Sequence, residues 1–374
     1  MSNPLYGPNR LKLGVFGANL DNGCVAVRAP GTFQATWPDV LDVTHLADEA
    51  GFEAMVPVAR WRGFGGATNF NGSCFETYTW AAGLGAQTQR IAVFATSHVP
   101  TMHPIVAAKQ ATTIDHISGG RFALNVVCGW FEPEFAMFGR PMMDHETRYQ
   151  YAGEWIEIVR RLWTAEDEFD YEGRFFRVEK GFHQPKPLQR PHPPIMNAGR
   201  SGIGNRFAAK YADMVFVSFW ESGHTGAGAA VREIRRLARE EFHRDVQVWS
   251  TAFVLCRPTE KEARDELTWI VEERGDWEAI DNLARIMRVD NPNVPPHVQR
   301  ARKARLITGY GSFPLVGTPE RIVDELRTLS ADGLDGVVLS WVNYRAELRQ
   351  FIAEILPLME QAGLRTAAGV PVGR

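Results

Sequence analysis

The sequence has few cysteines and no long hydrophobic run. Only four cysteines occur in 374 residues, Cys24, Cys74, Cys128 and Cys256, and their spacing matches neither a zinc site nor a redox pair. We interpret them as small core residues of a cytoplasmic protein, because the cytoplasm keeps thiols reduced. No apolar run approaches the ~18 residues of a membrane helix, and the first residues lack the features of a signal peptide. A membrane is therefore not an expected partner.

An excess of charge of one sign is also missing. The chain carries 41 basic and 44 acidic residues and no basic stripe, so nucleic acid is not an expected partner either. We find no defensible Ser-His-Asp order and no His-Glu-x-x-His helix, and we predict no metal site. With 45% hydrophobic and 23% charged residues, the chain can bury a large core. We expect a single domain over residues 1–374.

Strand and helix patterns alternate along the whole chain. Eight apolar runs are predicted to be strands, and amphipathic stretches separate them, which favours parallel pairing. A closed barrel fits this number and the chain length better than an open sheet, so we predict an α/β fold, a (β/α)8 TIM barrel with insertions. The predicted strands are Leu11–Phe16, Glu53–Val58, Ile91–Thr96, Arg121–Val127, Ile195–Ala198, Met214–Val217, Val246–Leu255 and Gly336–Leu339. The predicted helices are Pro38–Ala50, Glu76–Gln87, Ile105–Ile117, His145–Trp163, Ile203–Tyr211, Ala229–Phe242, Thr259–Glu273, Pro319–Ala331 and Arg345–Ala362.

Three segments exceed what a minimal barrel needs. The first segment, Phe169–Arg177, is predicted to form a small hairpin, and the second, Gln184–Pro194, is rich in proline. In a third segment, around 290–313, we expect prolines to prevent a regular helix and a basic cluster to repel itself without a counter-anion. We interpret this third segment as a mobile lid, with a solvated surface loop as the alternative. Its prolines are Pro292, Pro295 and Pro296, and its basic residues are Arg300, Arg302, Lys303 and Arg305.

Asn125 is a single polar residue inside an apolar strand pattern. The surrounding run, Phe122–Val127, is bracketed by glycines and is predicted to be buried on both faces. A buried amide without a partner costs about 1–3 kcal/mol, so this side chain must have something to bind. Asn125 is therefore either a satisfied internal asparagine or a residue that faces a polar ligand inside the barrel.

Other polar residues follow the predicted strands, at the end where a barrel of this kind carries its chemistry. Thr96 ends the third strand, shortly before His98, and Arg60 follows the second. The glycine-rich turn around Arg200 and Ser201 opens a helix, and such a turn can bind an anion through its N–H groups. Each feature also has a plain explanation, namely a structural histidine beside a proline turn or an ordinary connection from strand to helix.

Several motifs occur in an order that resembles one protein family. They are Arg62–Gly66, Thr112–Arg121, Asn125–Trp130, Tyr171–Phe176, Lys186–Gln189 and Val316–Pro319. Their order is similar to that of flavin-dependent monooxygenases of the bacterial-luciferase-like superfamily. Within it, the chain most resembles the branch of pyrimidine ring-opening, dimethylsulfone and alkanesulfonate monooxygenases. The resemblance extends over nearly the whole chain.

The resemblance implies a role for each matching residue. Asn125 and Thr96 are the implied catalytic residues, which line an oxygen pocket beside the flavin. His98, Trp130 and Cys128 are expected in the substrate pocket, and the sequence around His98 and Cys128 departs from the pattern of the branch. The resemblance therefore does not identify the substrate. Cofactor contacts are implied for Ala59, Arg60, Asn125, Glu134, Arg148, Tyr149, Arg200 and Ser201.

The implied function is that of an FMNH2-dependent two-component monooxygenase. Such an enzyme uses O2 and a flavin peroxide to oxidise a small organic substrate, by ring opening of an N-heterocycle or by C–S cleavage of a sulfone or sulfonate. FMN would arrive reduced from a separate NAD(P)H:flavin reductase, and the protein is expected to be a homodimer or homotetramer. Two alternatives remain, a deazaflavin (F420)-dependent hydride-transfer oxidoreductase and a flavin-binding protein without turnover.

Overall fold

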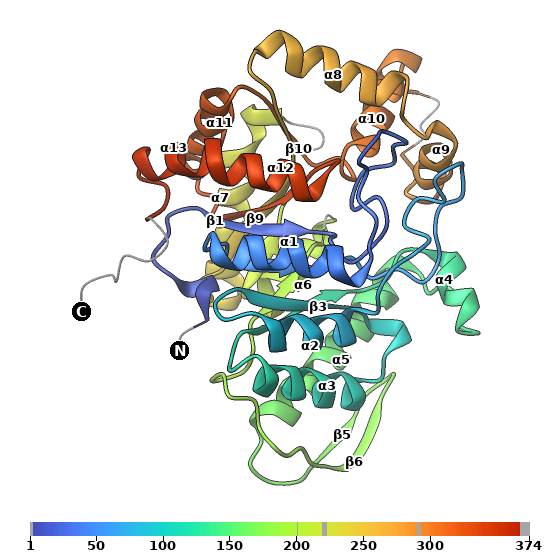
Figure 1. The fold of residues 1–374 in the computed structure, drawn as a ribbon. Coiled ribbons are helices and arrows are strands. Elements are labelled where there is room, and N and C mark those ends of the chain that lie inside the picture. Colours follow the sequence, from blue (N-terminus) through green and yellow to red (C-terminus); the bar gives the residue numbers. More distant parts are fainter. Residues whose placement is uncertain (1–2, 200, 219–222, 290–292, 367–374) are drawn as a thin grey trace.

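A closed sheet of parallel strands forms the centre of the molecule (Figure 1). The computed structural model describes residues 3–199, 201–218, 223–289 and 293–366. Strands pair in the order β9-β11-β1-β2-β3-β4-β7-β8, and β8 returns to β9, which confirms the predicted eight-stranded barrel. All eight predicted strands are present, with ends that differ by a few residues. They are β1 (Lys12–Phe16), β2 (Ala54–Val56), β3 (Ala92–His98), β4 (Phe122–Val127), β7 (Ile195–Asn197), β8 (Met214–Phe216), β9 (Gln247–Cys256) and β11 (Gly336–Ser340).

Helices cover the outside of the barrel and bury their apolar faces against the strands (Figure 1). The predicted helices are confirmed as α1 (Trp37–Glu49), α2 (Thr77–Gln87), α3 (Pro104–Ile117), α5 (His145–Thr164), α6 (Gly202–Tyr211), α7 (Gly223–Phe242), α8 (Glu260–Glu272) and α11 (Pro319–Ala331). The last predicted helix is divided into α12 (Tyr344–Gln350) and α13 (Leu356–Gln361) by a π-helical turn at Phe351–Ile355. Pro357 lies just beyond this turn and has no N–H to continue the regular hydrogen bonding. No helix among the described residues is long and apolar enough to cross a bilayer.

The amino end of the barrel is filled by side chains. Leu5, Trp249 and Phe94 belong to an interior cluster and are fully buried. Gly336 allows the Trp249 indole to approach closely, since a Cβ on Gly336 would lie 2.5 Å from this ring. The interior is therefore closed at this end, and polar chemistry is left to the carboxyl ends of the strands.

Several elements lie outside the simple barrel. The predicted hairpin is confirmed as β5 (Phe169–Glu172) paired with β6 (Arg177–Gly181). The sequence reasoning missed α4 (Glu132–Met137), α9 (Trp277–Ile286), α10 (Pro296–Ile307) and β10 (Phe313–Gly317). Strand β10 pairs with the second half of β9, beyond the point where β8 has ended.

The segment around 290–313 differs from its prediction in two ways. Prolines do not prevent a helix, because Pro296 occupies the first turn of α10, where a missing N–H needs no partner. The basic cluster also has counter-charges within the protein, since Arg300 pairs with Glu272 and Lys303 with Asp281. Pro292 lies outside the described residues. That this segment is a mobile lid stays a prediction.

Candidate active site

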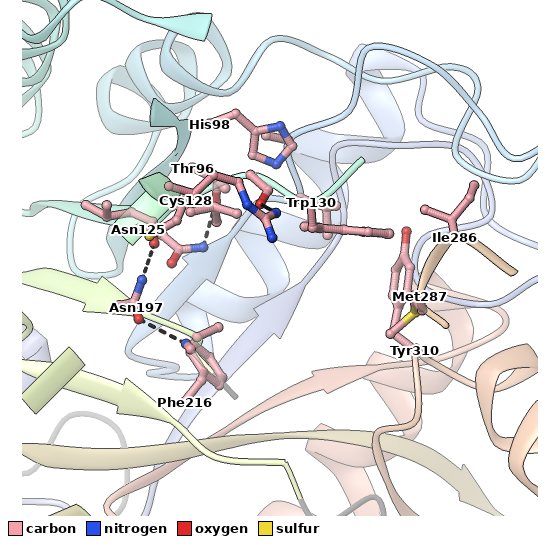
Figure 2. Close-up of a pocket in the computed structure, with 18 of the residues that line it drawn as sticks. Thr96, His98, Asn125, Cys128, Trp130, Asn197, Phe216, Ile286, Met287 and Tyr310 are labelled. Carbon is pink, nitrogen blue, oxygen red and sulfur yellow. Dashed lines mark hydrogen bonds between the residues drawn. The ribbon is translucent and has the colours of Figure 1, made fainter. Parts of the chain in front are cut away.

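A large cavity opens at the carboxyl ends of the barrel strands, as this fold predicts. Its volume is about 1230 Å³, more than the roughly 300–1000 Å³ of a typical site for one small molecule. Figure 2 shows Thr96, Asn125 and Asn197 on one side, Tyr310, Met287 and Ile286 on the other, and Trp130 between the two groups. The cavity has room for a cofactor and a substrate together.

Asn125 and Thr96 form a polar pair in the cavity wall. They occupy opposite positions in the parallel register of β3 and β4, and the Asn125 Nδ2 donates to the Thr96 Oγ1 at 3.1 Å. The Thr96 hydroxyl in turn donates to the Pro57 carbonyl at 2.6 Å. The Asn125 Oδ1 is buried and has no hydrogen-bond partner among the described residues. This acceptor is therefore available to an N–H or O–H donor in the cavity.

Arg60, Glu134 and His98 form a buried charged group beside this pair. The Arg60 guanidinium donates to the Glu134 Oε2 at 2.9 Å, and the Trp61 N–H donates to Oε1 at 2.7 Å. The His98 Nδ1 lies 3.3 Å from the same Oε2. Burial raises the pKa of Glu134, but the His98 contact and the Arg60 charge outweigh it and lower the pKa to about 2. Glu134 is therefore a carboxylate across the physiological pH range.

Aromatic rings hold Arg60 from the other side. Its guanidinium carbon lies 4.7 Å from the centre of the Trp130 ring and 5.4 Å from that of Phe64. Trp130 stacks on Phe64 with an interplanar angle of 17°. Cation–π contacts of this kind stabilise a desolvated guanidinium, so the position of Trp130 in the cavity wall is tied to the charge of Arg60.

The predicted anion-binding turn begins α6. Ser201 is the N-cap of this helix, and its Oγ accepts the Gly204 N–H at 3.0 Å. His145, at the start of α5, contacts the Ser201 Oγ through Nε2 at 2.9 Å and the Arg148 guanidinium through Nδ1 at 3.2 Å. Tyr149 lies close to the same helix start, because a Cβ on Gly204 would be 2.6 Å from its hydroxyl. A hydroxyl, an imidazole and a guanidinium thus gather where the helix dipole favours an anion.

Cys128 belongs to the apolar part of the wall. Burial raises the pKa of its thiol to about 12, and the charge of Arg148 opposes this only in part. The nucleophile in cysteine chemistry is the thiolate, so this side chain is not an activated nucleophile. It contributes shape and an apolar surface to the cavity.

Two features of the cavity wall were missed. Asn197, in β7, donates to the Val126 carbonyl at 2.7 Å and accepts the Gly199 N–H at 2.9 Å. An asparagine in a predicted strand was the same signal that singled out Asn125. Tyr310 has a φ of 58°, between two glycines that also have positive φ, and its ring faces the cavity (Figure 2). The Gly-Tyr-Gly sequence was a signal for such a turn.

The structure brings nearly all predicted site residues together. Glu134 does not line the cavity and instead supports Arg60 and Trp61 from behind, and Arg200 lies outside the described residues. Within the described ranges, no group of three potential metal ligands occurs. The predicted residues that line the cavity are Ala59, Arg60, Thr96, His98, Asn125, Cys128, Trp130, Arg148, Tyr149 and Ser201.

Two curated relatives align with almost the full chain. One is an FMNH2-dependent dimethylsulfone monooxygenase from Pseudomonas putida, which is 32% identical over 335 residues, or 88% of this chain and 90% of the relative. The other is pyrimidine monooxygenase RutA from Serratia proteamaculans, which is 30% identical over 365 residues, or 94% of this chain and 96% of the relative. Both belong to the branch that the motifs resemble.

Solved structures support the same fold at lower identity. Riboflavin lyase RcaE, solved with modified FMN and riboflavin, aligns with a TM-score of 0.84 at 22% identity, over 96% of this chain and 93% of its own. An F420-dependent secondary alcohol dehydrogenase aligns less well, with a TM-score of 0.66 at 15% identity, over 93% of this chain and 99% of its own. The sequence profile of the luciferase-like monooxygenases matches residues 23–336, and with this match the chain belongs to the luciferase-like monooxygenase family.

Proposed function

We propose that the protein is an FMNH2-dependent two-component monooxygenase that uses O2 to oxidise a small organic substrate. One observation carries the proposal, namely the unpartnered Asn125 Oδ1 beside Thr96 in the wall of a cavity large enough for cofactor and substrate. Membership of the luciferase-like monooxygenase family supports the same chemistry.

The residues of the cavity fit FMN in two places. Reduced flavin presents ring N–H donors, and the Asn125 Oδ1 is a buried acceptor that needs a donor. The phosphate would be held at the start of α6 by Ser201, with Arg148 and Tyr149 beside it. Charge-assisted hydrogen bonds to a phosphate are among the strongest in proteins, so this helix start would hold the cofactor by its phosphate.

When bound, reduced FMN supplies the electrons that activate O2. Asn125 would orient the oxygen through the amide N–H that Thr96 does not accept, and Thr96 would hold this amide in place. Trp130, Cys128 and His98 would line the space for the substrate. Their mainly apolar surfaces exclude water from the reacting atoms, which strengthens the electrostatic interactions inside.

The substrate belongs to one of two chemical classes in this proposal. One is an N-heterocycle that is opened, and the other is a sulfone or sulfonate that loses its C–S bond. A separate NAD(P)H:flavin reductase would supply FMNH2, and a homodimer or homotetramer is the expected assembly.

The test measures O2 consumption and product formation with each reduced cofactor. The protein is mixed with FMNH2 or reduced deazaflavin, with and without O2, and with panels of pyrimidines, sulfones and sulfonates. We expect an oxygenated product only with FMNH2 and O2 together. Hydride transfer from deazaflavin without O2 would refute the proposal. Tight FMN binding together with a failure to oxidise every member of the panels would refute it as well.

A further inference from the structure

His98 lies in the cavity wall next to the proposed oxygen pocket. It is two residues beyond Thr96 in β3, so both side chains point to the same side of the sheet, with His98 nearer the mouth of the barrel. The ring is buried, with 6% of its surface exposed, and it lines the large cavity (Figure 2). A histidine in this place can reach the atoms that react beside Thr96 and Asn125.

Glu134 determines which ring nitrogen of His98 carries hydrogen. The carboxylate is ionised and accepts hydrogen bonds only, so the Nδ1 that lies 3.3 Å from its Oε2 must be the donor. Arg60 and the Trp61 N–H hold both Glu134 oxygens in place. The remaining ring atom, Nε2, has no hydrogen-bond partner among the described residues and is left as an acceptor.

The surroundings of His98 favour the neutral ring. Burial lowers its pKa below the usual value of 6.5, although the Glu134 contact opposes this, and the Arg60 charge lowers it further. The other titratable groups nearby are Cys128, at the end of β4, and Glu76 and Tyr78, at the start of α2. Glu76 is engaged as the N-cap of α2, where it accepts the Tyr78 N–H at 3.0 Å. His98 therefore presents a basic nitrogen near neutral pH.

A second, small chamber lies behind His98. Its volume is about 30 Å³, and Arg60, Thr96 and His98 line both this chamber and the large cavity. The Tyr78 and Ser97 hydroxyls border the chamber, are buried and make no hydrogen bond of normal geometry with a described residue. Buried hydroxyls are normally satisfied by protein or water, and this space has room for about one water. Polar atoms thus extend from His98 into the small chamber, on the side away from the large cavity.

We propose that His98 is a proton-transfer residue of the active site and that Glu134 is the residue that positions it. The inference rests on the proposed oxygenase function and adds the group that moves the proton. The Nε2 would accept one proton from the reacting oxygen species and return it to the oxygen atom that leaves as water, and the reduced cofactor would supply the second proton of that water. The two electrons come from the reduced cofactor, so His98 ends the cycle unchanged. An imidazole oriented by a carboxylate is a general solution for such transfers.

The first experiment needs neither cofactor nor substrate. Nitrogen-15 NMR of histidine-labelled protein, with His98 assigned through the His98→Asn variant, reports the protonation of each ring nitrogen across a pH titration. We expect a neutral ring at pH 7 with hydrogen on Nδ1, and protonation only below pH 6.5. A ring with hydrogen on Nε2, or one that is already protonated at pH 7, would overturn the proposal.

The second experiment separates proton transfer from structure. In His98→Asn, the amide nitrogen can replace Nδ1 as the donor to Glu134, but nothing replaces Nε2. In single turnovers with FMNH2 and O2, we expect wild-type oxidation to slow as the pH falls through the pKa of His98. The variant should react about 100-fold more slowly or worse, without this acid limb, and should bind FMN as tightly as the wild type.

His103→Asn is the matched control. His103 caps α3 through its Nδ1, which accepts the Ile105 N–H at 3.3 Å, and asparagine is a good N-cap. This variant should keep both the wild-type rate and the acid limb. An unchanged rate and acid limb in His98→Asn would sink the proposal. If the wild type oxidises none of the substrates, the proposed function fails, and the NMR titration still decides the state of His98.

Discussion

The Asn125 amide donates to the Thr96 hydroxyl across two neighbouring strands, at 3.1 Å. Because that hydroxyl gives its own hydrogen to the Pro57 carbonyl, the direction of both hydrogen bonds is fixed. The Asn125 Oδ1 is then the amide atom left without a partner in the wall of the cavity. The pair therefore presents one defined acceptor to whatever occupies the site.

Asn125→Ala should abolish substrate oxidation while the protein stays folded. The lost hydrogen bond to Thr96 is worth only about 0.5–1.5 kcal/mol of stability, whereas the acceptor in the cavity disappears completely. FMNH2-dependent product formation and thermal unfolding measure the two effects. Thr96→Val is the companion variant, which keeps the shape but leaves the Asn125 amide without its acceptor. Full turnover in Asn125→Ala would contradict the role, and failure to fold would favour a structural asparagine.

Ser201→Ala should reduce the preference of the protein for FMN over riboflavin. If the start of α6 binds the phosphate, a charge-assisted bond worth about 1.5–3 kcal/mol is lost. Thr259→Ala is the matched control, because Thr259 caps α8 through the Glu262 N–H at 3.1 Å, as Ser201 caps α6. Both variants should lose about 1 kcal/mol of stability. Equal wild-type affinities for FMN and riboflavin, measured by fluorescence titration, would refute the phosphate site.

Gly129→Ala should destabilise the protein more than Gly139→Ala. Both glycines have positive φ, 88° and 64°, so each substitution costs about 1–2 kcal/mol of backbone strain. Only at Gly129 would the new Cβ also meet a buried ring, 2.3 Å from Phe135. We expect about 1–3 kcal/mol of additional destabilisation there, seen in chemical denaturation. Since Arg148 donates to the Gly129 carbonyl, FMN affinity should fall as well. Equal losses of stability would show that Phe135 moves aside freely.

The free energy of unfolding should fall as the pH decreases from about 6.5 to about 4. Burial lowers the pKa of His183 from 6.5 to about 4, with Lys109 and Lys186 adding to the effect. In this window the unfolded chain takes up a proton that the folded chain still refuses, so acid favours unfolding. His183→Gln can keep the contact with the Thr112 hydroxyl, which is 2.9 Å long in the wild type. The free energy of unfolding of this variant should depend less on pH, and His98 should account for part of the dependence that is left. An unchanged pH dependence would show that His183 does not contribute to it.

Trypsin should cut the free protein first between residues 300 and 305. The ion pairs Arg300–Glu272 and Lys303–Asp281 involve exposed carboxylates and contribute at most about 1 kcal/mol each. If the segment closes over a bound flavin, FMN should slow this cut, and FMNH2 with substrate should slow it further. Cleavage that is equally fast with saturating flavin and substrate would rule out a lid.

Sequence reasoning found the barrel because each of its strands is a short apolar run between helices of clear periodicity. It missed β10, since Pro314 argues against a strand, and the structure shows why this proline is tolerated. Among the described strands, β10 pairs with β9 alone, and proline is acceptable at such an edge. Helix α4 has six residues, too few for a helical period to be recognised.

The site was predictable in part for a similar reason. Residues on neighbouring barrel strands, such as Thr96 and Asn125, are placed by the barrel itself, so the order of the strands brings them together. Tyr310 and Met287 come from irregular segments, and their approach to the cavity depends on long-range packing that no local pattern encodes. The support that Glu134 gives to Arg60 could not be predicted either, because the two residues lie 74 positions apart in the sequence.

The way β9 and β10 pair has a consequence for how the family can vary. The pairing runs from Ala252 with Phe313 to Cys256 with Gly317, and the Arg257 N–H donates to the Gly317 carbonyl at 3.0 Å. Because this pairing is parallel, the intervening chain, with α8, α9 and α10, leaves beyond Cys256 and returns at Phe313, opposite Ala252. Closing a longer loop costs only about 0.6 kcal/mol for each doubling of its length. We therefore expect this stretch to tolerate changes of length that rebuild the cavity wall around Met287 and Tyr310, while β9 keeps its register with β8 and β11.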